Sequence, residues 1–109
     1  MADPLSVTTT TPDRDSAAAL AASAVREKLA ATAQVHGPVL SYFWHLGEAG
    51  EGEEWLVTLK TTSDRYAELE AHLIARHPWE KPEVTAVKLT EGAAHYLRWM
   101  ETATAPTDG

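Results

Sequence analysis

The sequence predicts an α+β fold in which two strand–helix–strand halves of similar length are followed by a further helix. Three observations support this prediction: segments whose apolar residues alternate, segments whose apolar residues recur at helical spacing, and the order in which the two kinds follow one another. That order is strand, helix, strand, strand, helix, strand and helix. The chain has 109 residues, which fits one domain.

The first strand and helix are predicted within the opening third of the chain. Residues 5–10 alternate, with Leu5, Val7 and Thr9 on one face. Thr11 and Pro12 are typical of a helix cap and a first helical residue. An apolar stripe is then predicted to face the sheet, and it consists of Ala18, Ala22, Val25 and Leu29.

A hairpin is predicted in the middle of the chain. Its first strand covers residues 35–46 and is interrupted early by Gly37 and Pro38, and its second strand covers residues 55–62. The segment from Gly47 to Glu54, with three glycines and four glutamates, is predicted to be the connecting turn.

The second half repeats the pattern. Ser63 or Asp64 is expected to cap a helix that ends before Pro78. Its inward stripe is Tyr66, Leu69 and Leu73. A fourth strand at residues 84–89 and a final helix at residues 93–102 complete the series.

This order of elements corresponds to the split β-α-β sandwich called ferredoxin-like, with an added C-terminal helix. The domain is expected to span residues 5–102, with flexible ends at residues 1–4 and 103–109. In such a fold the helices cover one face of the sheet, and the other face is left open. Four aromatic residues in the hairpin are therefore predicted to form an interface between copies, although a larger monomeric core is an alternative: Tyr42, Phe43, Trp44 and Trp55.

Composition and charge exclude several classes of function. The formal net charge is −7, which disfavours binding to nucleic acid. The absence of Cys removes disulfides, thiol nucleophiles and thiolate metal sites. No secretory leader and no membrane-spanning apolar run is evident, so a cytoplasmic location without membrane insertion is expected.

Five segments together resemble the CutA divalent-cation-tolerance proteins. They are Glu27–Ala31, Ser41–Trp44, Leu59–Thr62, His77–Glu83 and Tyr96–Trp99, and the likeness extends from about Leu5 to Thr102. The resemblance implies a homotrimer related to PII-type signalling proteins, which binds copper and other divalent cations and is not an enzyme. Many members have a cysteine where this chain has Thr32, whose hydroxyl is a poor ligand for Cu(I).

His77 and Glu83 are the candidate metal ligands. Pro78 and Pro82 stiffen the segment between them, and imidazole with carboxylate suits harder divalent ions. Two ligands form a weak site unless a neighbouring copy completes it. The alternative is structural, with His77 at the end of the helix and Glu83 at the start of the strand.

Other ionisable residues are assigned to the surface. The four hairpin glutamates lack EF-hand spacing and are expected to form a solvated acidic loop: Glu48, Glu51, Glu53 and Glu54. Four further histidines show no paired metal-ligand spacing and are expected at the surface or an interface: His36, His45, His72 and His95.

A ligand cleft is a further expectation. Lys60 is predicted to project from the open face of the sheet, where it would contact an anion or a neighbouring copy, and Tyr96 and Trp99 are candidates for the same cleft or for packing of the last helix. A PII-like sensor of a small molecule or nucleotide is the alternative function. The chain has no phosphate loop or nucleophile elbow, and it has no Asn for acylphosphatase chemistry. No organic cofactor is expected, and a further protein partner is left open.

Overall fold

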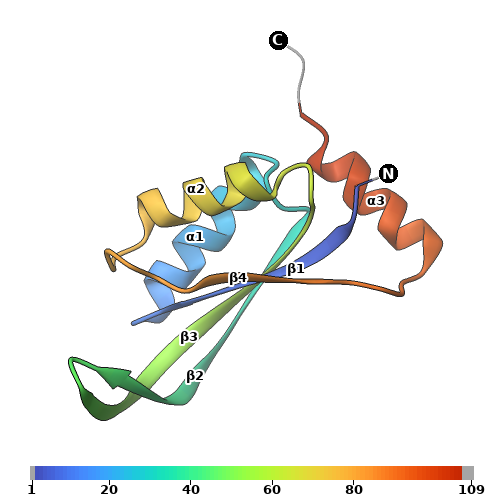
Figure 1. Ribbon diagram of the computed structural model, residues 1–109. Helices are drawn as coiled ribbons and strands as arrows, with labels where there is room; N and C mark the ends of the chain where they lie inside the picture. Colours follow the sequence, from blue (N-terminus) through green and yellow to red (C-terminus); the bar gives the residue numbers. More distant parts are fainter. Residues whose placement is uncertain (1, 107–109) are drawn as a thin grey trace.

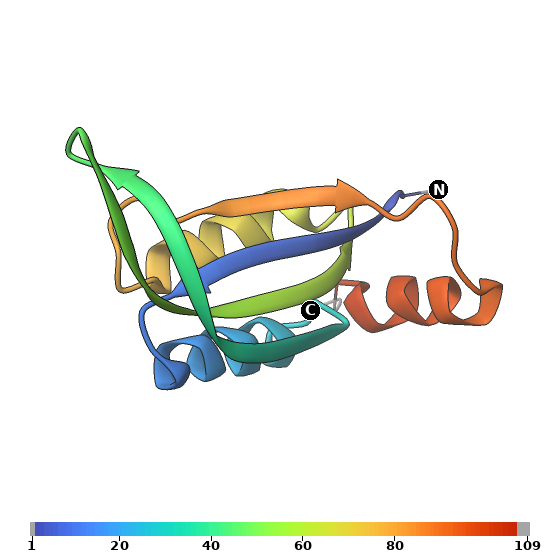
Figure 2. The same cartoon turned by 90° about the horizontal axis from the view of Figure 1, so that it is seen from below.

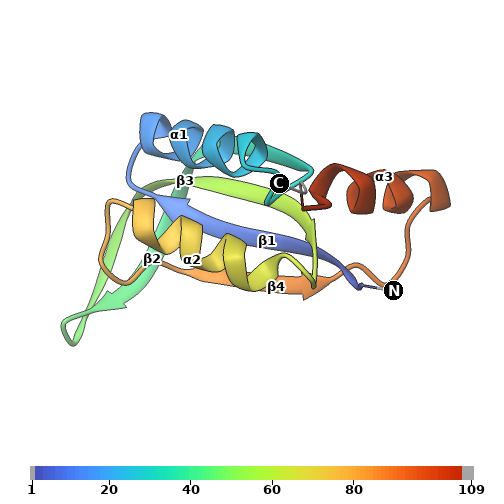
Figure 3. The same cartoon turned by 90° about the horizontal axis from the view of Figure 1, so that it is seen from above.

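The computed structural model describes residues 2–106 and confirms the predicted α+β class. Its elements, in chain order, are β1 (Pro4–Thr11), α1 (Arg14–Arg26), β2 (Thr32–His45), β3 (Glu48–Thr62), α2 (Tyr66–Arg76), β4 (Val84–Lys88) and α3 (Ala94–Thr104). The strands form one antiparallel sheet in the order β2-β3-β1-β4. Helices α1 and α2 lie side by side on one face of it, and α3 lies beyond one end (Figures 1 and 3).

The core lies between the sheet and the two covering helices. Along β1, Leu5, Val7 and Thr9 are buried while the residues between them are not, so the predicted alternation is confirmed. Val7 stands in register between Leu59 of β3 and Ala86 of β4. The buried apolar cluster also contains Val57, Leu69 and Leu73.

Helix α1 faces the sheet with a different stripe from the predicted one. Its buried residues are Ala17, Leu20, Ala21 and Ala24, whereas Ala18, Ala22 and Val25 are exposed. In this alanine-rich helix, Leu20 has the largest side chain that reaches the core, and it sets the inward face. The helix ends at Arg26, and Lys28 then takes a left-handed conformation with φ of 61°. Leu29 is buried, but it lies past the helix and does not continue the stripe.

Helix α1 also starts two residues later than predicted. Asp13 is the N-cap, and its Oδ1 accepts a hydrogen bond of 2.8 Å from the Ser16 N–H. This bond holds the pKa of Asp13 below its usual value, because it stabilises the charged carboxylate. Thr11 closes β1, and its hydroxyl donates to the Asp13 carbonyl.

The hairpin is longer and tighter than predicted. The segment expected to be a turn belongs to β3, and only Leu46 and Gly47 connect the strands, with φ of 52° and 80°. His45 pairs directly with Glu48. The four glutamates therefore lie on a strand, which corrects the expectation of an acidic loop. The hairpin end projects well past the helices (Figures 1 and 2).

The irregularity expected at Gly37 and Pro38 is present as a register shift in β2 between His36 and Val39. The Gly37–Pro38 peptide bond is cis. Gly37 approaches Trp55 so closely that a Cβ atom there would lie 2.7 Å from the ring.

The chain ends and α2 depart from prediction in detail. Neither Ser63 nor Asp64 caps α2; the N-cap position is Arg65, without a side-chain cap bond. Ser63 instead exchanges two hydrogen bonds with Asp3, because its Oγ accepts from the Asp3 N–H and its N–H donates to the Asp3 carbonyl. The predicted end of α2 before Pro78 is confirmed. Helix α3 extends two residues beyond the predicted end, so residues 103 and 104, which were expected to be part of a flexible tail, are helical, and Thr104 is buried. Met1 and residues 107–109 lie outside the described part.

Candidate functional site

His77, the first predicted metal ligand, directly follows α2, and both of its ring nitrogens have backbone partners. Nε2 lies 2.7 Å from the carbonyl oxygen of Thr10, and the Trp79 N–H donates to Nδ1 over 3.0 Å. Because a carbonyl can only accept, Nε2 carries the proton and Nδ1 is the acceptor. The rings of His77 and Trp79 also pack at 5.3 Å between centroids. His77 therefore offers a lone pair to a metal only if the bond from Trp79 is released.

Glu83, the second predicted ligand, is exposed just before β4, and its Oε2 accepts a hydrogen bond of 2.9 Å from the Thr85 hydroxyl. Within residues 2–106 of one chain, no three His, Asp or Glu side chains gather closely enough to hold a metal ion. Among the described residues, His77 and Glu83 thus belong to no group of three such side chains in a single copy.

Lys60 lies on the open face of the sheet. It alternates along β3 with the buried Leu59 and Thr61, and its neighbours in register are Thr32 of β2 and Ser6 of β1. Thr32 is the position at which many relatives are expected to have cysteine. Here that position stands beside an ammonium group, which repels a cation, and it presents a hydroxyl, which is a poor ligand for soft metals.

The four hairpin aromatic residues predicted to form an interface are divided between two faces. Tyr42 and Trp44 are 73% and 79% exposed and lie on the same side of the hairpin. Phe43 lies on the other side, with its ring against Gly50 of β3. Trp55 is partly buried and packs against the core. The hairpin tip, Leu46, is 90% exposed.

Tyr96 and Trp99, the remaining cleft candidates, are both partly exposed on α3. Their rings form a pair with centroids 5.4 Å apart. The same helix is attached to the body of the protein through the fully buried Met100. The structure therefore brings Tyr96 and Trp99 together.

The other histidines differ in environment. His36, His45 and His95 are exposed, as expected. His72 is half-buried between α2 and α1, where its Nε2 lies 2.7 Å from the Ser23 hydroxyl. Burial lowers the pKa of His72, and the nearby Arg76 guanidinium lowers it further, while Glu27 acts weakly in the opposite direction.

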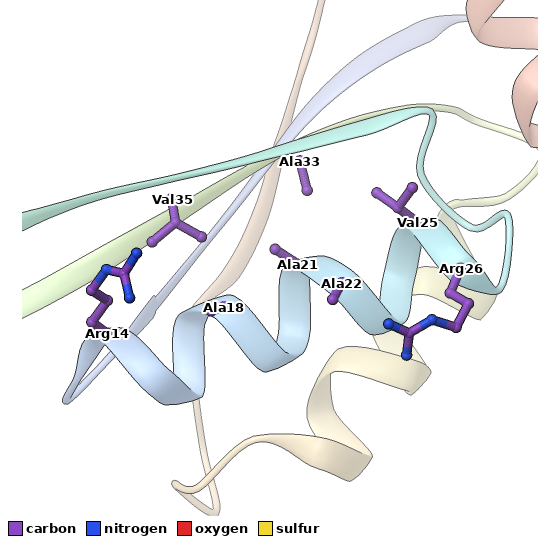
Figure 4. Close-up of a pocket in the computed structure, with 8 residues that line it drawn as sticks. All are labelled: Arg14, Ala18, Ala21, Ala22, Val25, Arg26, Ala33 and Val35. Carbon is purple, nitrogen blue, oxygen red and sulfur yellow. The ribbon is translucent and has the colours of Figure 1, made fainter.

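Two of the clefts among the described residues are of interest here, and neither was predicted. One, of about 630 Å³, runs between α1 and the edge strand β2; its floor consists of alanines and valines, and Arg14 and Arg26 lie at its two ends (Figure 4). It contains Ala18, Ala22 and Val25, the residues expected to face the sheet. The other, of about 590 Å³, lies between the hairpin and the segment that precedes β4, and its lining residues are Phe43, His45, Glu54, Trp79, Glu80 and Lys81. In the sequence, the one feature that pointed to this second cleft is Trp79, which directly follows His77 and Pro78 in the segment that resembles the family.

The fold defines a small α+β protein with one open sheet face and a projecting hairpin. The family model described as "CutA1 divalent ion tolerance protein" matches residues 5–103. The divalent-cation tolerance protein CutA of Escherichia coli O139:H28 is 36% identical over 92 residues, which cover 84% of this chain and 81% of that protein. The chain therefore belongs to the CutA1 divalent-ion tolerance family.

Solved structures agree with this assignment. CutA1 from Oryza sativa superposes with a TM-score of 0.92 at 29% identity, over 97% of each chain. The divalent cation tolerance protein from Thermus thermophilus superposes with a TM-score of 0.91 at 31% identity, over 94% of this chain and 99% of the other. Within the described residues, no helix is both long and apolar enough to cross a membrane.

Proposed function

We propose that the protein is a non-catalytic homotrimer that binds divalent cations, copper among them, and contributes in this way to cation tolerance. The observation that carries the proposal is the family match over residues 5–103, which includes the His77–Glu83 segment. Relatives with similar sequences and structures are named for tolerance of divalent cations.

The exposed hairpin supports the assembly. Tyr42 and Trp44 lie on the sheet face that the helices cover elsewhere, but the hairpin extends beyond α1 and α2 (Figure 1). Fully burying one large apolar side chain contributes about 1.5–3 kcal/mol, so a neighbouring copy that covers Tyr42, Trp44 and Leu46 would gain substantially. Trp55, which is already mostly covered by its own chain, would contribute less.

The cation site is proposed to form between copies. Glu83 is exposed and contributes an oxygen ligand, His77 contributes Nδ1 after releasing the Trp79 N–H, and a donor from a neighbouring copy completes the set. Such a set of nitrogen and oxygen ligands suits Cu(II) or Zn(II). With Thr32 in place of cysteine, Cu(I) is not the expected ion.

Calorimetric titration of the metal-stripped protein with Cu(II), Zn(II) and Mg(II) tests the site. The Glu83→Gln variant should weaken Cu(II) binding about tenfold or more, because an anionic ligand is lost. Glu91→Gln, at another exposed glutamate, is the matched control and should bind like the wild type. Failure of the wild type to bind any of the three ions, or equal affinity of the wild type and Glu83→Gln, would refute the proposal.

His77→Ala requires a second readout, because its ring also joins Thr10 to Trp79. Metal affinity and Tm should be measured together. A loss of affinity in His77→Ala without a similar loss in Glu83→Gln would assign His77 a structural role only.

The sensor alternative receives no support from the geometry. A PII-like sensor is expected to have a long regulatory loop between the second and third strands, and here Leu46 and Gly47 alone connect β2 to β3.

A further inference from the structure

The cleft between the hairpin and the α2–β4 segment combines aromatic surface with acidic groups. Phe43 and Glu54 reach it from the same face of the hairpin, and Trp79 and Glu80 reach it from the segment before β4. Figure 2 shows the hairpin curving at this end of the sheet, near the start of β4. Residues far apart in sequence thus form the two walls.

Both aromatic walls are held in place by identified contacts. Trp79 is fixed through its N–H bond to His77 Nδ1 and through ring packing on the same histidine, which is itself bonded to Thr10. Phe43 lies over Gly50, where a Cβ atom would come within 3.0 Å of Cε1. Both rings are partly exposed, with fractions of 42% for Phe43 and 38% for Trp79. The cleft is therefore lined by two aromatic rings that are each held by a neighbouring group and partly exposed to solvent.

The charges around the cleft favour a cation. Glu54 and Glu80 contribute two negative charges and Lys81 one positive charge, and the whole chain has a formal net charge of −7. An aromatic face attracts a cation through its quadrupole, by about 0.5–2 kcal/mol for each favourable contact. A hydrated divalent metal ion gains little from aromatic carbon, whereas an alkylated ammonium group has both apolar surface and charge. A phosphate-bearing ligand would be repelled.

We propose that this cleft binds an organic cation with an alkylated ammonium group, which lies between Phe43 and Trp79 and is balanced by Glu54 and Glu80. The proposal depends only on groups within one chain. It does not require the proposed metal site or the trimer. Because a metal on His77 would release the Trp79 N–H that helps to fix this wall, the cleft is tested on metal-free protein, and either proposal can fail without the other.

The first test compares two ligands of the same shape. Choline carries a quaternary nitrogen, and 3,3-dimethylbutan-1-ol has a carbon atom in its place and no charge. Titrations followed by NMR should give saturable binding of choline and binding of the neutral alcohol that is about tenfold weaker. Equal affinity for both, or no saturable binding of choline, would overturn the proposal.

Variants locate the site. Trp79→Leu keeps an apolar side chain but removes the aromatic face, and Glu54→Gln removes one charge; each should weaken choline binding about threefold to tenfold. Val87→Ala, at an exposed apolar residue of β4 outside the cleft lining, should have no effect. Unchanged binding by both cleft variants would overturn the assignment to this cleft.

Misfolding could also weaken choline binding, so a variant that is expected to bind choline more tightly is a useful third test. Lys81→Gln removes an ammonium group from the lining and should tighten choline binding. Equal or weaker binding by a folded Lys81→Gln protein, verified by circular dichroism, would contradict the electrostatic part of the proposal.

Discussion

Gly37 lies directly against the indole ring of Trp55, in the irregular part of β2 opposite β3. A Cβ atom at residue 37 would lie 2.7 Å from Cδ2 and 2.9 Å from Cε3 of Trp55, and 3.1 Å from the carbonyl oxygen of Glu54. Distances under 3.0 Å force atoms to move, and one wall of this space is backbone. The absence of a side chain at residue 37 therefore lets Trp55 pack against the core.

Gly37→Ala is expected to lower the free energy of unfolding by about 1–3 kcal/mol, because Trp55 must leave its packed position. Chemical denaturation measures the loss, and near-UV circular dichroism reports the indole environment. Gly52→Ala is the control, because no atom lies within 4 Å of its added Cβ. Equal stability of the Gly37→Ala protein and the wild type would show that the ring moves without cost.

Two buried threonines differ in one hydrogen bond. Thr9 and Thr61 are both fully buried, but the Thr61 hydroxyl donates to the Leu29 carbonyl over 2.7 Å, whereas the Thr9 hydroxyl has no partner among the described residues. Thr9→Val should therefore stabilise the protein by about 1 kcal/mol, and Thr61→Val should destabilise it by about 1–2 kcal/mol. Urea denaturation of the two variants is the measurement. A destabilising Thr9→Val would mean that its hydroxyl does have a partner.

His72 should make stability depend on pH. Burial and Arg76 lower its pKa in the folded chain below the usual 6.5, so the unfolded chain binds the proton more readily. The contribution of His72 is complete above pH 6.5 and is lost as the pH falls from there through the lowered folded-state value. In His72→Gln, the slope of Tm against pH should flatten in this window. An unchanged slope would assign the dependence to another group.

The proposed interface predicts a change of mass. Tyr42→Glu should convert the assembly to monomers or aggregates, because a charge would be buried between copies. Ile74→Glu introduces the same charge at a partly exposed apolar position of α2 and should leave the mass unchanged. Size-exclusion chromatography with light scattering measures both. A trimer that persists in Tyr42→Glu would count against this interface.

The order of strands and helices could be predicted from sequence, because alternation in residues 5–10 and the Tyr66, Leu69 and Leu73 spacing survive in the structure. The hairpin turn could not. Strands are depleted in glycine and glutamate, so residues 47–54 resemble a loop, and Leu46 is an unusual residue at positive φ. The phase of α1 was missed because alanine occupies both its inward and its outward positions.

The candidate site shows a similar division. The segment that contains His77 and Glu83 could be identified from sequence as chemically distinctive. The partner of the His77 ring could not, since Thr10 is 67 residues away and contributes only its carbonyl group. The cleft between Phe43 and Trp79 could not be predicted either, since its two walls are far apart in sequence and meet only because of the way the hairpin curves.

In the hairpin, glutamates pair with apolar residues, and this limits which surfaces can bind the exposed hairpin of a single chain. Glu51 stands opposite Tyr42 and Glu53 opposite Leu40, so a carboxylate accompanies each of these apolar side chains on this face. Two identical hairpins stacked with these faces together would bring the carboxylates close to one another, and the resulting repulsion opposes such stacking. The hairpin can therefore expose apolar side chains while its own face is disfavoured as their partner, so a copy that covers them must do so with a different part of its surface.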